Sequence, residues 1–260
     1  MHPGDYPEFR TAACPGAQRP GAFLSFVNNG ESEMNVHRLK LLASASLASI
    51  LLAACASPAV SPQAPGVTYE ITVVRSWSEA THPLDWPGVT AHFTGGIGAT
   101  HNDAYAMFGA GRIATPGLEM LSQKGMSTPF DQELAAAKTS GTVGAIFQTG
   151  AVWTVGGTTA AQVTATDAFP ILSFAMMVAP SPDWFTGVPA LALKRDGQWI
   201  DSETITLYAW DSGTNDAKTY KADKISVNPF LPIMLNDAPM FMKDGVRIAV
   251  GTATIRRADR

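Results

Sequence analysis

The sequence predicts an all-β fold, an antiparallel β-sandwich into which two short helices are inserted. Many short apolar or alternating segments follow one another with turn residues between them, and strands do not alternate with long helices. The 23 Gly and 18 Pro residues are spread without a triplet period, as in a turn-rich chain. With 260 residues the chain is long enough to bury a full core, so folding requires no disulfide or metal.

The predicted strands begin at Val67, from which apolar and polar residues alternate up to Val73. The unbroken apolar run at 171–178 predicts a central strand that is buried on both faces. Asp-Gly dipeptides favour the type I′ turns that join hairpin strands. The other predicted strands are 152–155 and 158–164 around Gly156-Gly157, 191–194 and 198–200 around Asp196-Gly197, 204–210, and 246–250 after Asp244-Gly245.

Two Thr-Pro pairs predict the starts of the helices. Thr115-Pro116 opens a helix that Gly125 closes, and Thr128-Pro129 opens a second one that runs towards Gly141. Threonine caps free backbone N–H groups, and proline suits the first helical position, where a missing donor costs nothing.

The first part of the chain has the pattern of a secretory signal. A basic segment with Arg38 and Lys40 precedes an apolar run at 41–54, which is too short to span a bilayer. Leu52-Ala53-Ala54-Cys55 resembles a bacterial lipobox, so we expect a lipoprotein signal peptide at 34–54 and lipidation of Cys55. The alternative is an ordinary signal peptide that contains a cysteine.

The other boundaries follow from that signal. Residues 1–33 precede the signal and are expected to be a leader from an incorrectly assigned start, with Met34 as the true one. Residues 55–66 form a Pro/Ser/Ala tether, and 67–258 form the folded domain. By resemblance to enterobacterial sorting, Ala56 after the cysteine favours the outer membrane. The expected location is therefore the bacterial cell envelope, as an exported outer-membrane lipoprotein.

Charge and cysteine content exclude several classes of function. The net charge of −4 argues against nucleic acid as a partner, and against membrane contact other than through the lipid anchor. Only Cys14 and Cys55 are present, which excludes a disulfide framework and a cysteine-based zinc site.

Two acidic turns are the candidate metal site. Asp183 and Asp211 each follow a predicted strand and are flanked by aromatic residues. Because loops of a sandwich meet at its ends, the two carboxylates can approach each other. Carboxylates, backbone carbonyls and water are the ligands that Ca²⁺ prefers. The alternative is that both residues only cap turns, as aspartate often does.

Several motifs resemble the spondin domain, the N-terminal module of the matrix proteins F-spondin and mindin. They keep order and spacing over most of 69–255, and Pro180-Ser181-Pro182-Asp183-Trp184 with Asp211-Ser212-Gly213-Thr214 is the most specific of them. The other matching stretches are Thr81-His82-Pro83 with Asp85 and Pro87, Ala91-His92-Phe93, Ile97 to Asn102, Ala114 to Gly117, Ala179 to Val188 and Leu207 to Thr214.

This resemblance implies a sandwich similar to C2 domains, with one Ca²⁺ held by loop aspartates. The family's ligand positions correspond to Asp183, Asp211 and position 215. Here position 215 is Asn215 and is followed by Asp216. Either the Asn215 amide oxygen completes the site, or a shift of one residue lets Asp216 do so. The cysteines of the animal domains are absent.

The predicted function is a non-catalytic, calcium-binding, lipid-anchored envelope module for surface binding or adhesion. Its partner would be an unknown surface protein or glycan, which Trp184 and Trp210 would contact. The alternative is a hydrolase or other enzyme that uses loop aspartates with three histidines, although no nucleophile motif is present. The three histidines are His82, His92 and His101. If they lie together in an open pocket, the enzyme hypothesis is favoured. A third hypothesis is a purely structural envelope protein whose metal loop is empty. The neutral Asn215 at the third ligand position is the best argument for it.

Overall fold

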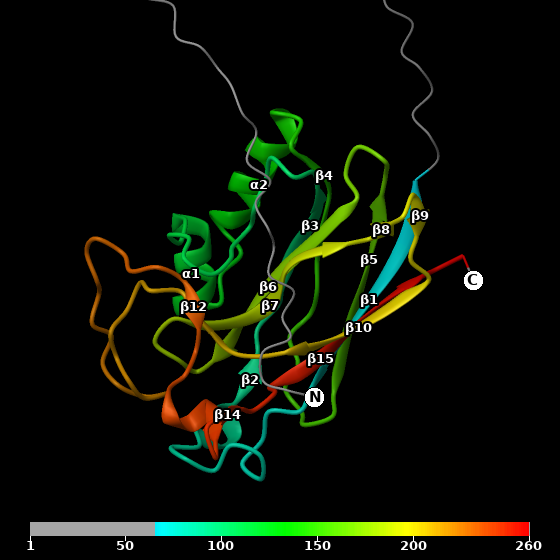
Figure 1. Ribbon diagram of the computed structural model, residues 1–260. Coiled ribbons are helices and arrows are strands. Elements are labelled where there is room, and N and C mark those ends of the chain that lie inside the picture. The colour runs from blue at the N-terminus through cyan, green and yellow to red at the C-terminus, as the bar shows by residue number, and fades with distance from the viewer. Residues whose placement is uncertain (1–65, 260) are drawn as a thin grey trace, which may run out of the picture. The chain divides into compact units, whose positions relative to one another are not determined.

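The computed structural model describes residues 66–259. Two antiparallel sheets pack together, and two short helices cover the outer face of one of them (Figure 1). The predicted all-β sandwich with two inserted helices is therefore confirmed.

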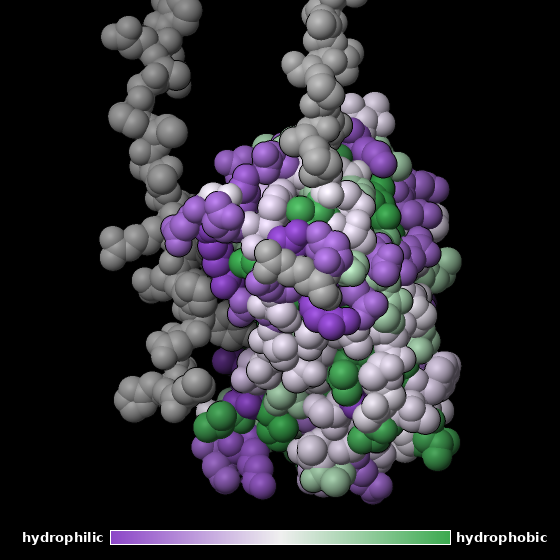
Figure 2. Space-filling model, turned by 90° about the vertical axis from the view of Figure 1, so that its right-hand side faces the viewer, coloured by the Kyte–Doolittle hydropathy of each residue, from purple (hydrophilic) through white to green (hydrophobic). Residues whose placement is uncertain are grey.

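The smaller sheet has four strands, with β1 in its interior. The inward positions of β1 are buried and alternate with half-buried outward ones, and Ile71 lies opposite both Ile255 and Ala161. The outer face carries many threonines, and Figure 2 shows a wide pale area of intermediate hydropathy on this side of the molecule. In sheet order the strands are β10 (Ser202–Leu207), β15 (Gly251–Arg257), β1 (Val67–Arg75) and β5 (Thr158–Ala165).

The larger sheet has seven strands, and β6 (Ile171–Ala179) lies at its centre. From Leu172 onward every residue of β6 is buried, because the other sheet covers one face and the helices cover the other. The predicted central strand is confirmed. Its neighbours in order are β12 (Met234–Leu235), β11 (Trp210–Asp211), β7 (Trp184–Ala192), then β6, β3 (Ile97–His101) and β4 (Val143–Gln148), while β2 (His92–Phe93) pairs with the end of β6.

Each interface between layers buries its own apolar cluster, which is the main stabilising contribution to the fold. The larger cluster lies between the sheets and includes Tyr69, Trp77, Phe93, Phe174 and Trp184. The smaller one lies between the larger sheet and the helices and includes Ile97, Leu118, Phe130, Leu134 and Phe185.

Helix α1 (Pro116–Lys124) has the predicted ends. The Thr115 hydroxyl accepts a hydrogen bond from the Leu118 N–H, and Gly125 closes the helix with a φ of +68°. Helix α2 (Phe130–Thr139) differs from the prediction because Pro129 occupies the N-cap and no side chain caps the helix. The Thr128 hydroxyl instead donates to the Asp131 carboxylate.

The predicted hairpin around Gly156-Gly157 is wrong. Val152 forms an isolated bridge with Phe93, and β5 pairs with β1 rather than with 152–155. The preceding strand, β4, was missed because its sequence Val143-Gly-Ala-Ile-Phe-Gln148 shows no clear alternation.

The predicted strand at 204–210 is two strands in different sheets. The chain leaves the smaller sheet after Leu207 and enters the larger one at Trp210. Trp210 is therefore buried in the smaller apolar cluster, between the larger sheet and the helices. The predicted strand at 246–250 is shorter than expected, since only Val246–Arg247 forms a strand, and it is not the last one, which is β15 at Gly251–Arg257.

Both predicted Asp-Gly turns are present. Asp196 and Gly197 have φ angles of 50° and 77°, and Asp244 and Gly245 have 51° and 77°, as a type I′ turn requires. They join β8 (Lys194–Arg195) to β9 (Gln198–Trp199) and β13 (Met242–Lys243) to β14 (Val246–Arg247). Single 3₁₀ turns lie at Gly88–Thr90 (η1) and Pro239–Phe241 (η2).

The predicted leader, signal peptide and Cys55 lie outside the described residues, as does the tether apart from Gly66. Within 66–259, no helix is long and apolar enough to cross a membrane.

Candidate functional site

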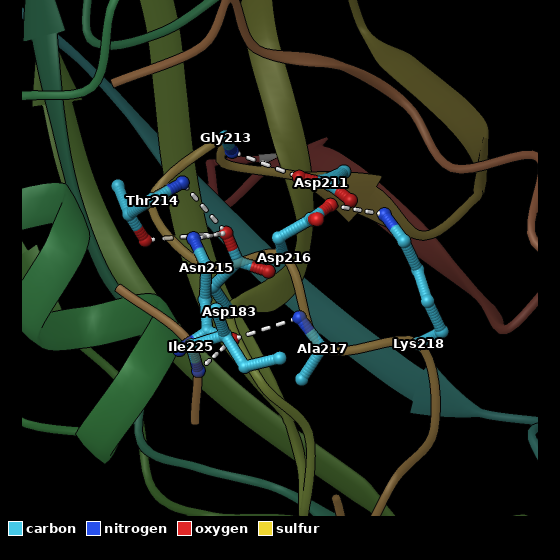
Figure 3. A network of polar contacts seen from close by, with 9 residues as sticks. All are labelled: Asp183, Asp211, Gly213, Thr214, Asn215, Asp216, Ala217, Lys218 and Ile225. Atoms are coloured by element: carbon cyan, nitrogen blue, oxygen red, sulfur yellow. Dashed lines mark hydrogen bonds and ion pairs between the residues drawn. The ribbon is translucent and has the colours of Figure 1, made fainter. Parts of the chain in front are cut away.

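Asp183 is fully buried at the end of the turn between β6 and β7. Its Oδ2 accepts four hydrogen bonds from one segment, and Figure 3 shows those that Thr214 and Asn215 donate. The donors are the Ser212 hydroxyl at 3.0 Å, the Thr214 N–H at 2.8 Å, the Thr214 hydroxyl at 3.2 Å and the Asn215 N–H at 3.0 Å. This number of donors indicates an ionised carboxylate, because each bond favours the charged form.

The pairing of β11 with β7 brings the second acidic residue to the same place. Asp211 lies opposite Trp184, one residue after Asp183 in the chain. Asp211 Oδ1 accepts the Gly213 N–H at 2.8 Å, and Gly213 has a φ of +72°. The tight turn that results aims the following N–H groups at Asp183.

Helix α1 supports the same turn from behind. The Ser122 hydroxyl donates to the Ser212 hydroxyl at 3.0 Å, and Gln123 Nε2 donates to the Thr214 hydroxyl at 3.0 Å. All four side chains are buried. The donors around Asp183 are therefore fixed by packing as well as by the backbone.

One oxygen of this carboxylate has no partner. Asp183 Oδ1 is buried and accepts no hydrogen bond. Burial raises the pKa of Asp183, although its hydrogen bonds act in the opposite direction. Burial and the charge of Asp183 raise the pKa of Asp211 to about 6. Two carboxylates that oppose each other's ionisation, with one bare buried oxygen, form a site that suits a cation.

Asn215 and Asp216 are not equivalent candidates for a third ligand. Asn215 Oδ1 already accepts the N–H groups of Ala217 and Ile225, both at 3.0 Å, which use its two lone pairs. Asp216 is exposed and pairs with Lys218. Figure 3 shows its carboxylate on the side of Asp211, and its charge contributes to the raised pKa of Asp211. The Asn215 amide oxygen is thus already satisfied, whereas the Asp216 carboxylate has an exposed partner.

Lysines lie near these acids. Lys218 donates a hydrogen bond to Asp216, which raises the pKa of Lys218, and the charges of Asp216, Asp211 and Asp183 raise this pKa further. Lys224 donates to the Gln123 carbonyl. Over residues 66–259 no group of three His, Cys, Asp or Glu side chains is placed closely enough to hold a metal ion. A third acidic ligand would therefore have to move.

A model of the Spondin_N family matches residues 67–238, which include every residue described above at this site. This chain belongs to the Spondin_N family. It is 29% identical over 168 residues to Spondin-2 of Rattus norvegicus, covering 64% of this chain and 51% of that protein. It is also 29% identical over 161 residues to Spondin-1 of Gallus gallus, covering 59% and 20%. The chain thus spans about half of the first relative and a fifth of the second.

Two aromatic residues of the spondin domain do not lie where the sequence placed them. Trp184 and Trp210 were expected to contact a ligand, but only 2% and 6% of their surfaces are exposed. Trp184 packs edge-on against Tyr220 and Phe241, and Trp210 stacks with Phe185. The expectation is corrected, because these indoles fill the two cores and present no face to a ligand.

The three histidines of the domain do not converge. His82 is buried, with Nδ1 2.8 Å from the Thr81 hydroxyl, and burial lowers its pKa to about 4. His101 is buried, with Nε2 2.7 Å from the Ser173 hydroxyl, and burial also lowers its pKa. His92 instead stacks on Trp153. Two of the three histidines are buried, and each contacts a different partner, so they do not form the open shared pocket that the enzyme hypothesis requires.

Sequence reasoning missed the residues that hold the Asp183 carboxylate. Ser212 and Thr214 were noted only as parts of a motif, yet their hydroxyls bind Oδ2. A signal was present: hydroxyl residues around a glycine, directly after an aspartate, form a turn that points several donors at an anion.

Proposed function

We propose that this spondin domain is a non-catalytic, calcium-binding module that recognises a surface component outside the cell. The observation that carries the proposal is the buried, unpartnered Oδ1 of Asp183 beside Asp211. A buried carboxylate oxygen without a partner is costly, and a divalent cation would satisfy it. The family analogy of matrix adhesion supports a binding role but does not identify the partner.

The ligands would be Asp183 Oδ1, the Asp211 carboxylate and the Asp216 carboxylate, with backbone carbonyls and water. Calcium would neutralise the repulsion among these acids and release Asp216 from Lys218. The donors on Oδ2 would keep Asp183 fixed while Oδ1 binds the ion. The loop at 211–216 would then become the most rigid part of this edge of the domain.

Calcium is expected to raise the melting temperature by about 5 °C or more at saturating concentration, because only the folded state carries the site. Without calcium, in chelator, the raised pKa of Asp211 makes the folded state less stable as the pH rises. The folded state then binds more protons than the unfolded state between about pH 4 and about pH 6, so the free energy of unfolding falls as the pH rises. The expected fall is about 1–2 kcal/mol, and calcium should abolish it. Differential scanning calorimetry at several pH values measures both effects.

Asp211→Asn should remove the calcium response and reduce this fall, whereas Asp103→Asn, at an exposed aspartate elsewhere, should leave both intact. Asp216→Asn should weaken calcium binding if Asp216 completes the site. Equal melting temperatures with calcium and with chelator in the unaltered protein would refute the metal proposal.

We also propose that the domain is exported and held at the cell envelope by a lipid on Cys55, with the outer membrane as its destination. The support is the lipobox and the basic and apolar segments before it. Radiolabelled palmitate should enter the protein but not the Cys55→Ser variant. Equal labelling of both would show that the cysteine is not the acceptor.

A further inference from the structure

Arg75 occupies a position where the strand pattern requires an apolar residue. The inward-facing positions of β1 are Val67, Tyr69, Ile71, Val73 and then Arg75, and all are buried. Only 3% of the Arg75 surface is exposed. A charged side chain at the last core position of a strand is costly unless it is paired.

The guanidinium group of Arg75 is poorly satisfied. Nη1 donates to the Ala91 carbonyl, while Nε is buried and has no partner. None of the ion pairs found within residues 66–259 includes Arg75. The ring of Trp77 lies 6.0 Å from the guanidinium carbon, at the limit of a cation–π contact. Because arginine stays protonated in proteins, Arg75 is a buried cation without an anion.

Arg75 is one of the residues that line an open pocket of about 700 Å³ at the end of β1. The volume is in the usual range for sites that bind small molecules. Its walls are formed mainly by apolar and aromatic groups, with few polar ones. The residues that matter most here are Arg75, Ser78, Glu79, Trp86, Trp153 and Val155.

Trp153 gives the pocket a flat, exposed wall. The side chain is 59% exposed, and the His92 ring stacks on it with centroids 3.8 Å apart and an angle of 11° between the planes. His92 thus covers one face of the indole. The neighbouring Val152 exchanges both backbone hydrogen bonds with Phe93, at 2.9 and 3.0 Å. These contacts fix the wall without a ligand.

The same loop is tied to the strand that carries the cation. The Gly156 N–H donates to the Arg75 carbonyl at 2.8 Å, and the Arg75 N–H donates to the Gly157 carbonyl at 3.2 Å. The aromatic wall and the guanidinium are therefore held in one arrangement. Such preorganisation lowers the entropy that a ligand must lose on binding.

The charges of the lining determine which anion fits. Arg75 is its cation, and the exposed Glu79 is its anion. A densely charged polyanion would meet one positive and one negative group and gain little. A ligand with a single carboxylate matches the planar guanidinium fork. The rest of the ligand must offer a flat apolar face to the Trp153 indole and hydroxyl groups that donate to the Glu79 carboxylate.

We propose that this pocket binds an acidic saccharide, with a uronate carboxylate on Arg75 and the C–H face of a pyranose ring on Trp153. Glu79 accepts hydrogen bonds from sugar hydroxyls. The site contains none of Asp183, Asp211 or Asp216, so it does not require the calcium proposal.

The test uses isothermal titration calorimetry of the full-length chain with galacturonate, with a disaccharide that contains one glucuronate, and with the methyl ester of galacturonate. Titrations are run in chelator, so that calcium held by the uronate does not contribute. We expect at least one uronate to bind, and the uncharged ester to bind at least about tenfold more weakly, as expected for the loss of a charge-assisted hydrogen bond.

Arg75→Met should weaken uronate binding at least about tenfold without lowering the melting temperature, because an apolar residue suits a buried position. The matched control is Arg195→Met, at an exposed arginine that pairs with Glu203. Trp153→Ala should weaken binding of acid and ester alike, and Ile113→Ala, at a residue of similar exposure, should not. The Nε–H resonance of Arg75 should shift on titration with uronate only.

Three results would overturn the proposal. The first is that the protein binds the uronate and its methyl ester with equal affinity. The second is that both the Arg75→Met and the Trp153→Ala variant bind uronate as tightly as the unaltered protein. The third is that neither uronate binds. Should a peptide carboxylate or inorganic phosphate bind in their place, the pocket serves another anion. Because Trp153→Ala alters an exposed side chain, it remains informative even if Arg75→Met does not fold.

Discussion

Replacing Asp183 by Ala is expected to lower the free energy of unfolding by about 3–5 kcal/mol. The substitution removes the single acceptor of four hydrogen bonds, two from backbone N–H groups and two from hydroxyls. The buried N–H groups of Thr214 and Asn215 would then lose the acceptor that they share. Urea unfolding followed by circular dichroism measures the loss.

Asp183→Asn is the matched variant, because its amide oxygen can accept the same four donors while the amide nitrogen takes the place of the unpartnered Oδ1. In chelator at pH 7 we expect it to be as stable as the unaltered protein or more so, since it removes a buried charge. It should nevertheless lose the calcium response. If Asp183→Asn were as damaging as Asp183→Ala, the charge itself would be holding the turn, and Oδ1 would not be a free ligand.

Gly213→Ala is expected to cost at least about 3 kcal/mol of unfolding free energy. A Cβ at this position would lie 2.2 Å from the Leu231 carbonyl oxygen, and the φ of +72° disfavours any side chain. Because Gly213 forms the turn that presents Thr214 and Asn215 to Asp183, the substitution should also reduce calcium affinity. Chemical denaturation and calcium titration measure the two effects.

The control is Gly197→Ala, which has a φ of +77° and no atom within 4 Å of the added Cβ. It should cost only about 1–2 kcal/mol, the conformational penalty alone. The difference between the two variants isolates the clash with Leu231. If both variants lost a similar amount of unfolding free energy, the backbone around Gly213 would be able to move away from Leu231, and the turn would not hold the site in place.

Strong local patterns predicted the elements that local chemistry controls. The apolar run of β6, the Asp-Gly turns and the caps of α1 were found because each depends on residues within a few positions. The strand β5 was assigned the wrong partner because its exposed Thr and Ala residues carry no signal of which strand lies beside them. Pairing across the sheet is a long-range property that alternation does not encode.

The candidate site was predicted in part. Asp183 and Asp211 were singled out from their turns, and the structure places both at one edge through the pairing of β11 with β7. That the Asn215 amide oxygen already accepts two backbone N–H groups could not be seen in the sequence, because one of the donors lies ten residues away in the chain. The roles of Trp184 and Trp210 were misjudged because an aromatic residue beside a turn looks the same whether it faces solvent or a core.

The sequence by itself determined the central strand, the two Asp-Gly turns, the first helix and the resemblance to a family. Only the tertiary structure decided which carboxylate oxygen is bare and that Arg75 is a core position with no anion. The reason is physical: turns and caps are fixed by neighbours in the chain. The cost of a buried charge depends instead on every group that folding brings around it.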